Sequence, residues 1–226
     1  MSSFPRLRSL AAVAIATLAA GWPAAHAQST TVGNSATGWY GSLDGAFTHV
    51  SDITGTSSGA NFTTHFKDGW EAGGTIGYTF LNTNPSDLAD NNLALALEAE
   101  GGYIRNDVDT VSVLGGSASA HGYLEQVPIT GSIVLRYHIF SPLTVFAGIG
   151  GGMGYEHLNI NSVGGTGFST SDSDWEAAYQ AKAGVDLSFG GGLGLDAGVK
   201  YYHLFRTNMG TSINTRMLYA GLTWSF

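Results

Sequence analysis

Eight ionisable residues could form a charged site, because they recur at alternate positions in segments that are otherwise apolar or rich in glycine. They are Asp44, Glu98, Glu100, Arg136, Lys182, Asp186, Asp196 and Lys200. Three bases among five acids could pair as ions, or they could line a path for ions and small solutes. Which of these they do depends on the elements that carry them.

The other residues that could take part in catalysis or metal binding do not predict a catalytic, cofactor or metal site. His49, His65, His121 and His157 lack the HxH and HExxH spacings of metal-binding histidines. The run Gly148–Gly154 matches GxGxxG only inside a strand-like segment with no helix after it, so it predicts close packing of side chains and not nucleotide binding. The chain has no cysteine, which excludes disulfides, thiol catalysis and cysteine-ligated zinc.

The composition is unusual for a surface that faces water. Of the 226 residues only 12% are charged, while 33 are glycine and 10 are tyrosine. The net charge of −8, without a cluster of Lys and Arg, argues against a nucleic-acid partner. Something other than water is therefore expected to cover much of the chain.

The N-terminus predicts export. Arg6 and Arg8 precede the apolar run LAAVAIATLAAG, and Ala25-His26-Ala27 is an A-x-A cleavage site. We predict a cleaved signal peptide at 1–27, with a retained membrane anchor as the alternative, and a short periplasmic segment at 28–38. No later stretch has about 18 consecutive apolar residues, so a membrane-spanning chain would have to be a closed β-barrel.

The rest of the chain, 39–226, predicts an all-β fold, an eight-stranded antiparallel transmembrane β-barrel. Segments with period-two alternation lie at 39–50, 69–80, 92–104, 123–140, 143–156, 174–189, 193–205 and 215–226. The connections 51–68, 105–122, 157–173 and 206–214 are polar and mostly long, as outer loops are, whereas 141–142 and 190–192 predict tight periplasmic turns. The long connection 81–92 has no explanation in this pattern.

The charges on the strands distinguish a membrane barrel from a water-soluble one. A soluble sandwich or lipocalin-like barrel has the same alternation with the faces exchanged, so alternation alone leaves both open. The uncharged aromatic stripes, the signal segment and the C-terminal stretch MLYAGLTWSF favour the membrane barrel. The eight charges then point into the lumen.

Several segments resemble, in order, the strands of the small outer-membrane β-barrel family that includes opacity-type surface antigens, "porin family proteins" and the OmpA-like transmembrane domain. They are GWYGSLDGAF, LALEAEGGYI, TVFAGIGGGMGY, LDAGVKYYHLF and LYAGLTWSF. The resemblance implies a bacterial outer-membrane location, contact with lipid, and periplasmic chaperones and the insertion machinery as partners. It also implies that Tyr219, Leu222, Trp224 and Phe226 form the C-terminal insertion signal. No peptidoglycan-binding domain follows, so a cell-wall tether is not implied.

His203 is the residue most similar to part of an enzyme site. The chain resembles a lipid deacylase of this size in architecture, but the deacylase pattern has Ser two residues after the His, where this sequence has Phe205. An interfacial histidine beside Tyr201 and Tyr202 is therefore expected in its place. We expect no enzyme and no cofactor.

An eight-stranded barrel is just wide enough for its own side chains, so the lumen charges are expected to form a plug. A symmetric hairpin at 190–192 would place Lys182 opposite Lys200 and Asp186 opposite Asp196, so each cation would need an acid from across the lumen. We expect a monomeric structural or surface-exposed barrel for envelope integrity or surface interaction; a narrow porin is the alternative and a lipid-modifying enzyme the third candidate.

Overall fold

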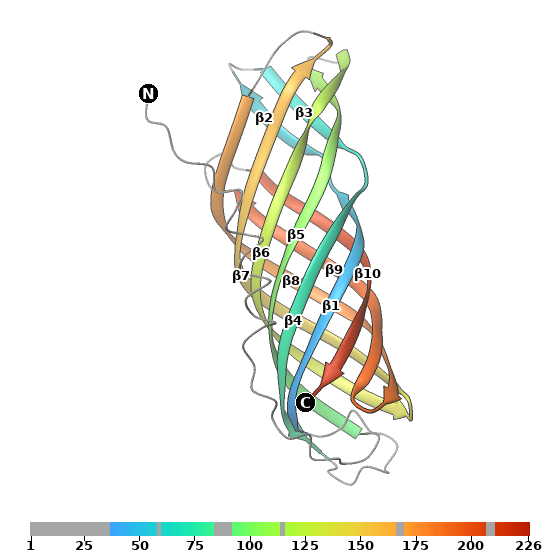
Figure 1. Ribbon diagram of the computed structural model, residues 1–226. Helices are drawn as coiled ribbons and strands as arrows, with labels where there is room; N and C mark the ends of the chain where they lie inside the picture. Colours follow the sequence, from blue (N-terminus) through green and yellow to red (C-terminus); the bar gives the residue numbers. More distant parts are fainter. Residues whose placement is uncertain (1–36, 58–59, 84–91, 114–115, 166–169, 207–210) are drawn as a thin grey trace, which may run out of the picture. The chain divides into compact units, whose positions relative to one another are not determined.

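The computed structural model describes residues 37–57, 60–83, 92–113, 116–165, 170–206 and 211–226 (Figure 1). The predicted signal peptide at 1–27, nearly all of the predicted segment 28–38 and most of the connection 81–92 lie outside these ranges. The strands are β1 (Gly38–Val50), β2 (Ile53–Ser57), β3 (Ala60–Phe66), β4 (Gly69–Asn82), β5 (Asn92–Val113), β6 (Gly116–Phe140), β7 (Leu143–Val163), β8 (Thr170–Gly190), β9 (Leu193–Arg206) and β10 (Thr211–Ser225). Within the described residues, no helix is long and apolar enough to cross a membrane.

Eight of these strands close into an antiparallel ring. Each of β4 to β9 pairs with the next strand in the chain, and β1 pairs with β4 on one side and with β10 on the other. The closing register runs from Tyr40 opposite Ser225 to Val50 opposite Thr215. The predicted eight-stranded antiparallel barrel is confirmed, and the last strand ends where it seals the ring.

Two of the connections at one end of the barrel are tight turns. Ser141 and Pro142 connect β6 to β7, and Gly191 and Gly192 connect β8 to β9. Gly190, Gly191 and Gly192 all have positive φ, between 64° and 86°, which residues with a Cβ rarely adopt. Because short turns face the periplasm in outer-membrane barrels, this end is the periplasmic one.

The strands extend much further at the opposite end than predicted. The predicted loops 105–122 and 157–173 are mostly strand, because β5 continues to Val113, β6 begins at Gly116, β7 continues to Val163 and β8 begins at Thr170. The expectation of long irregular loops there was wrong. Outward apolar residues stop at the membrane surface, whereas backbone pairing continues beyond it, so a search for apolar alternation ended these strands too early.

The predicted loop 51–68 also contains a hairpin, made of β2 and β3. β3 pairs with the extension of β5, from Phe62 opposite Val113 to Phe66 opposite Val108. The Thr- and Ser-rich sequence gave no apolar alternation, and the pairing depends on an edge that β5 provides from 40 or more residues away in the chain.

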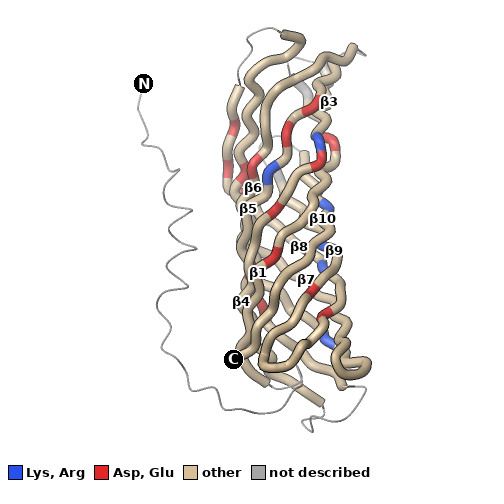
Figure 2. The backbone as a smooth tube through the Cα atoms, turned by 45° about the vertical axis from the view of Figure 1, so that its right-hand side comes forward, with Lys and Arg blue, Asp and Glu red and all other residues tan. Residues whose placement is uncertain are grey.

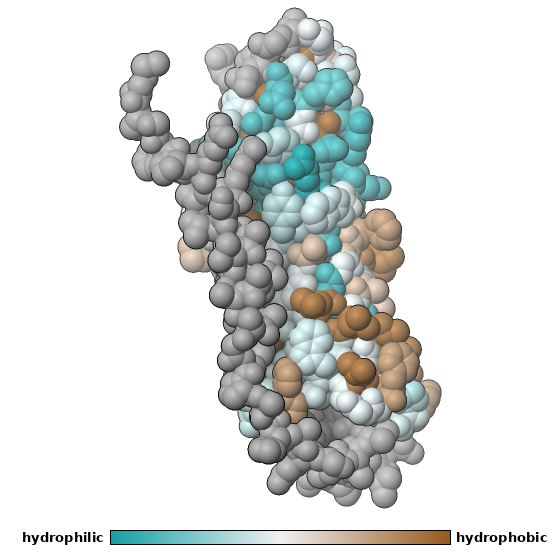
Figure 3. Space-filling view, viewed as in Figure 1, coloured by the Kyte–Doolittle hydropathy of each residue, from teal (hydrophilic) through white to brown (hydrophobic). Residues whose placement is uncertain are grey.

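The side-chain pattern reverses along the barrel. In the spanning half the outward residues are large and apolar, such as Leu97, which is 53% exposed, and Leu218, which is 62% exposed. In the half of the barrel away from the periplasmic end, which we call the extension, apolar residues form an inward-facing cluster, with Ile104, Leu124 and Leu204 no more than 1% exposed. Figure 3 shows the resulting change from apolar residues near the periplasmic end to hydrophilic residues at the other end.

Aromatic pairs mark the two borders of the apolar band. Trp39 and Tyr78 lie 5.1 Å apart near the periplasmic end. Tyr155 and Trp175 lie 5.5 Å apart where the extension begins, as do Trp70 and Tyr103. Such pairs correspond to the aromatic girdles at the two membrane surfaces.

The buried apolar residues of the extension should behave like a soluble protein core. Leu124→Ala should lower the free energy of unfolding by about 2–5 kcal/mol, because it leaves a cavity. Leu97→Ala is the matched control on the lipid-facing wall, where lipid refills the space and the loss should be smaller. Urea unfolding in detergent micelles measures both, and equal losses would contradict an inward apolar core.

Candidate functional site: the charge network of the lumen

The inward positions of the spanning half carry the charged residues. Alternation along each strand places Asp44 of β1, Glu71 of β4, Glu98 and Glu100 of β5 and Lys200 of β9 on the inner face, and all are buried. Figure 2 shows charged positions at mid-height of the barrel as well as near the end that carries β3. Burying charge is costly unless the charges are paired, so their contacts decide what the lumen can do.

Lys200 is bound by carboxylates from three other strands. Its Nζ lies 2.6 Å from Asp44 Oδ2, 2.8 Å from Glu100 Oε1 and 3.5 Å from Glu71 Oε1. The ammonium also lies 4.6 Å from the centre of the Tyr219 ring, within the range of a cation–π contact. Its side chain is only 4% exposed.

Lys182 binds the two neighbouring glutamates of β5. Its Nζ forms an ion pair with Glu98 and lies 2.9 Å from Glu100 Oε2. Gln180, two residues earlier on β8, donates to the same Glu100 oxygen at 3.3 Å and to Ser132 Oγ at 2.9 Å. Glu100 therefore joins Lys182 to Lys200.

Arg136 extends the network toward the periplasmic end. Its guanidinium lies 3.4 Å from Glu98 Oε1 and 3.2 Å from Asp186 Oδ2. The guanidinium also lies 4.4 Å from the centre of the Tyr40 ring and 5.7 Å from that of Phe146. The Tyr40 hydroxyl donates to Glu98 at 2.5 Å, so Glu98 is held by two cations and a phenol.

The β8–β9 hairpin places like charges opposite each other. Lys182 lies opposite Lys200, and Asp186 lies opposite Asp196, as a symmetric hairpin requires. Directly opposed like charges are unfavourable, so the acids of β1, β4 and β5 must offset the repulsion between the lysines.

The structure brings seven of the eight predicted charges into one set of ion pairs, and Asp196 is the exception. Asp196 lines the same part of the lumen but makes no ion pair with a described residue. Glu71, Tyr40 and Gln180 belong to the network but were not in the predicted set. The alternation along their strands predicts that they lie on the inner face, but their partners depend on the register around the whole ring.

Little space is left between these side chains. The cavity among them has a volume of about 20 Å³, enough for about one water molecule. Glycines on the inner face make room for large residues opposite, since a Cβ at Gly154 would collide with the Tyr202 hydroxyl and one at Gly77 with the Tyr40 ring. Beyond the charges, the apolar residues of the extension fill the inner face.

Among the described residues, the histidines lie outside the lumen charge network. Nδ1 of His203 lies 2.6 Å from Asn214 Oδ1, and its ring stacks on Tyr179 at 4.7 Å and meets the edge of Phe205 at 4.5 Å. Nδ1 of His49 lies 2.8 Å from Asp68 Oδ1. Over the described ranges, no three His, Asp or Glu side chains form a group able to hold a metal ion.

The residues of the C-terminal strand divide between the two faces. Tyr219 points into the lumen and is buried, whereas Leu222 and Phe226 are exposed. Trp224 covers Gly41 on the outer wall, because a Cβ at Gly41 would lie 2.9 Å from the indole ring. Three apolar side chains of the stretch are thus accessible from outside the barrel.

The comparison with protein families agrees with this architecture. Residues 10–226 match the model of the outer membrane protein beta-barrel domain. The chain belongs to that family. The protein is therefore a bacterial outer-membrane β-barrel, in contact with the lipid of that membrane.

A solved structure gives the same fold. Neisserial surface protein A aligns over 84% of this chain and 98% of its own, with a TM-score of 0.50 and 18% identity. The attachment invasion locus protein Ail of Yersinia pestis, in complex with the heparin analogue sucrose octasulfate, aligns over 83% and 99%, with a TM-score of 0.40 and 14% identity. The outer membrane enzyme PagL aligns over 80% and 97%, with a TM-score of 0.40 and 12% identity. No curated protein sequence matches the chain.

Removing one cation of the network should destabilise the barrel. Lys200→Ala leaves Asp44, Glu71 and Glu100 without their shared partner, at an expected cost of about 3–5 kcal/mol in unfolding free energy. Lys67→Ala is the control, since Lys67 is 60% exposed and lies 3.7 Å from Asp109, and its loss should cost less than about 1 kcal/mol. Urea unfolding in micelles provides the measurement; a Lys200 variant as stable as wild type would show that the lysine does not hold the network together.

Proposed function

We propose that this protein is a structural, surface-exposed component of the outer membrane whose lumen is closed by its own charges. The observation that supports this is the set of ion pairs across the lumen, in which three cations share five carboxylates from β1, β4, β5 and β8. The cavity among these side chains has a volume of only about 20 Å³, which supports closure of the lumen at this height.

The extension suits contact with the surroundings. β2, β3 and the ends of β5 to β8 that lie beyond the aromatic border are paired with one another as a sheet. The buried residues beneath them keep this surface rigid. A rigid, sheet-like outer surface favours roles in envelope integrity or in surface interaction. The Gly-, Ser- and Thr-rich sequence there specifies no particular ligand.

A narrow cation-preferring porin is the second candidate, and one observation favours it. The network has more carboxylates than cations, so an ion entering the lumen would meet net negative charge. An enzyme comes third, because His203 contacts Asn214, Tyr179 and Phe205 rather than a nucleophile in a catalytic arrangement.

Planar-bilayer recording distinguishes the closed barrel from the porin. The refolded protein without its signal segment should give small, intermittent currents weighted toward cations, because the ion pairs must separate before an ion can pass. Lys182→Ala removes the ion pairs of Lys182 with Glu98 and Glu100 across the lumen, and it should raise the current or lower the free energy of unfolding. Large, steady wild-type conductance would overturn the proposed closure.

We also propose that Tyr219, Leu222, Trp224 and Phe226 are read by the outer-membrane insertion machinery after periplasmic chaperones deliver the chain. The resemblance of the last strand to that of the family supports this role, and the exposure of Leu222 and Phe226 makes them accessible. The chain closes its own ring, so a monomer suffices.

Deleting Phe226 should reduce the amount of folded protein in the outer membrane while leaving refolding into micelles nearly unchanged. The residue follows Ser225, the last residue of β10, and its side chain is 66% exposed. Membrane fractionation with heat-modifiable gel migration measures assembly in cells, and the same gel measures refolding in vitro. Wild-type levels of the deletion variant in the membrane would refute the signal role.

A further inference from the structure

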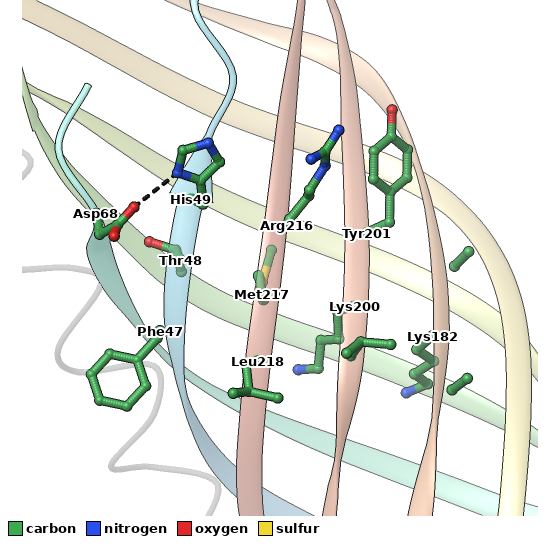
Figure 4. Close-up of a pocket in the computed structure, with 13 residues that line it drawn as sticks. Phe47, Thr48, His49, Asp68, Lys182, Lys200, Tyr201, Arg216, Met217 and Leu218 are labelled. Carbon is green, nitrogen blue, oxygen red and sulfur yellow. Dashed lines mark hydrogen bonds and ion pairs between the residues drawn. The ribbon is translucent and has the colours of Figure 1, made fainter. Parts of the chain in front are cut away.

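A pocket on the outer wall of the barrel crosses β8, β9, β10 and β1 (Figure 4). Its outward-facing floor consists of Ala181, Ala183, Val199 and Leu218, and Phe47 forms one side. Ala183, Val199, Leu218 and Phe47 follow one another in register across the four strands, so the small side chain of Ala183 lies at one end of the row and the Phe47 ring at the other. The floor is apolar throughout.

The polar side of the pocket lies two residues further from the periplasmic end along each strand. Arg216 faces Tyr201 on one side and His49 on the other, and all three line the pocket. Arg216 is nine residues from Ser225 along a strand that rises about 3.3 Å per residue and tilts by roughly 40°, which places it about 23 Å above the periplasmic border. An apolar band of about 25 Å therefore ends close to Arg216.

Arg216 differs from Arg105, which also lies at this border. Arg105 lies 3.1 Å from Glu125 and 4.6 Å from the centre of the Tyr123 ring, so its charge is matched within the protein. Arg216 is exposed and makes no ion pair with any residue in the described ranges. The carboxylate that also lines the pocket, Asp68, is held 2.8 Å from His49.

We propose that this pocket binds a phosphate-bearing acylated lipid of the outer leaflet. The planar guanidinium of Arg216 donates two parallel hydrogen bonds to phosphate oxygens, and one acyl chain lies over Ala181, Ala183 and Val199. The occupant follows from the setting, since the floor faces hydrocarbon and a cation at its edge attracts an anionic headgroup. The site is on the wall and does not depend on whether the lumen conducts.

Native mass spectrometry of the refolded protein in detergent tests the site, with phosphatidic acid as the probe. Arg216→Gln should weaken its binding about tenfold, the equivalent of losing one charge-assisted contact. Arg216→Lys keeps the charge but cannot donate two parallel hydrogen bonds, so its affinity for phosphatidic acid should lie between those of wild type and Arg216→Gln. Ala183→Leu fills the floor with another apolar residue and should also weaken binding, without affecting membrane insertion.

Two variants and two further probes complete the test. Arg105→Gln and Ala99→Leu alter the same residue types elsewhere on the outer wall and should bind phosphatidic acid as wild type does. Phosphatidylcholine, which is zwitterionic, should bind more weakly, and glycerol 3-phosphate, which has no acyl chain, should not compete. Gel migration before and after heating verifies that each variant is folded.

Three results would overturn the proposal. Wild-type affinity in Arg216→Gln would show that the cation is not used, and equal binding of phosphatidylcholine would show an unselective lipid surface. Effective competition by glycerol 3-phosphate would show a phosphate site without an acyl groove.

Discussion

Hydrocarbon offers no partner for backbone N–H and C=O groups, and this constraint governs the whole structure. Every strand in the spanning half must pair on both sides, which only a closed ring allows. The ring closes between β1 and β10, so the first and last segments of the barrel depend on each other although nearly the whole domain separates them. Closure also fixes the width of the lumen and therefore which side chains meet inside it.

The barrel wall faces lipid in its spanning half and water in the extension. In the spanning half the wall is apolar outside and charged inside, and in the extension it is polar outside and buries an apolar cluster inside, together with polar residues such as Gln126 and Glu156. Strands β5 to β8 run through both regions, so the same backbone pairing supports opposite side-chain patterns. The border between the two patterns is where Tyr155, Trp175, Trp70 and Tyr103 lie.

The sequence was sufficient to predict the eight strands of the ring, because lipid contact imposes a strong apolar alternation on segments such as 92–104 and 193–205. It was insufficient beyond the membrane border, where β5 continues to Val113 and β3 pairs with it. There the outward residues are polar, so period-two alternation no longer has the polarity expected of a spanning strand. The ends of strands were therefore the least predictable part of the fold.

The charge network was predictable by position but not by partner. The parity of Lys182, Lys200 and Glu98 along their strands placed them on one face, and the turn at 190–192 predicted which pairs oppose each other. That Glu100 joins Lys182 to Lys200 depends on the stagger of β5 relative to β8 and β9, which are not its neighbours in the ring. Local sequence contains no information about that stagger.

The hairpin of β8 and β9 has a consequence for the order of assembly. With Lys182 opposite Lys200 and Asp186 opposite Asp196, this hairpin repels itself when it stands alone. The acids that relieve the two lysines come from β1, β4 and β5, at the other end of the domain. In a partly formed sheet that contains β8 and β9 but not β1, β4 and β5, the two lysines therefore lack their carboxylate partners. The last hairpins gain stability only when the early strands are in place. Folding is made cooperative by charge as well as by backbone pairing, and intermediates that lack either half of the barrel are disfavoured.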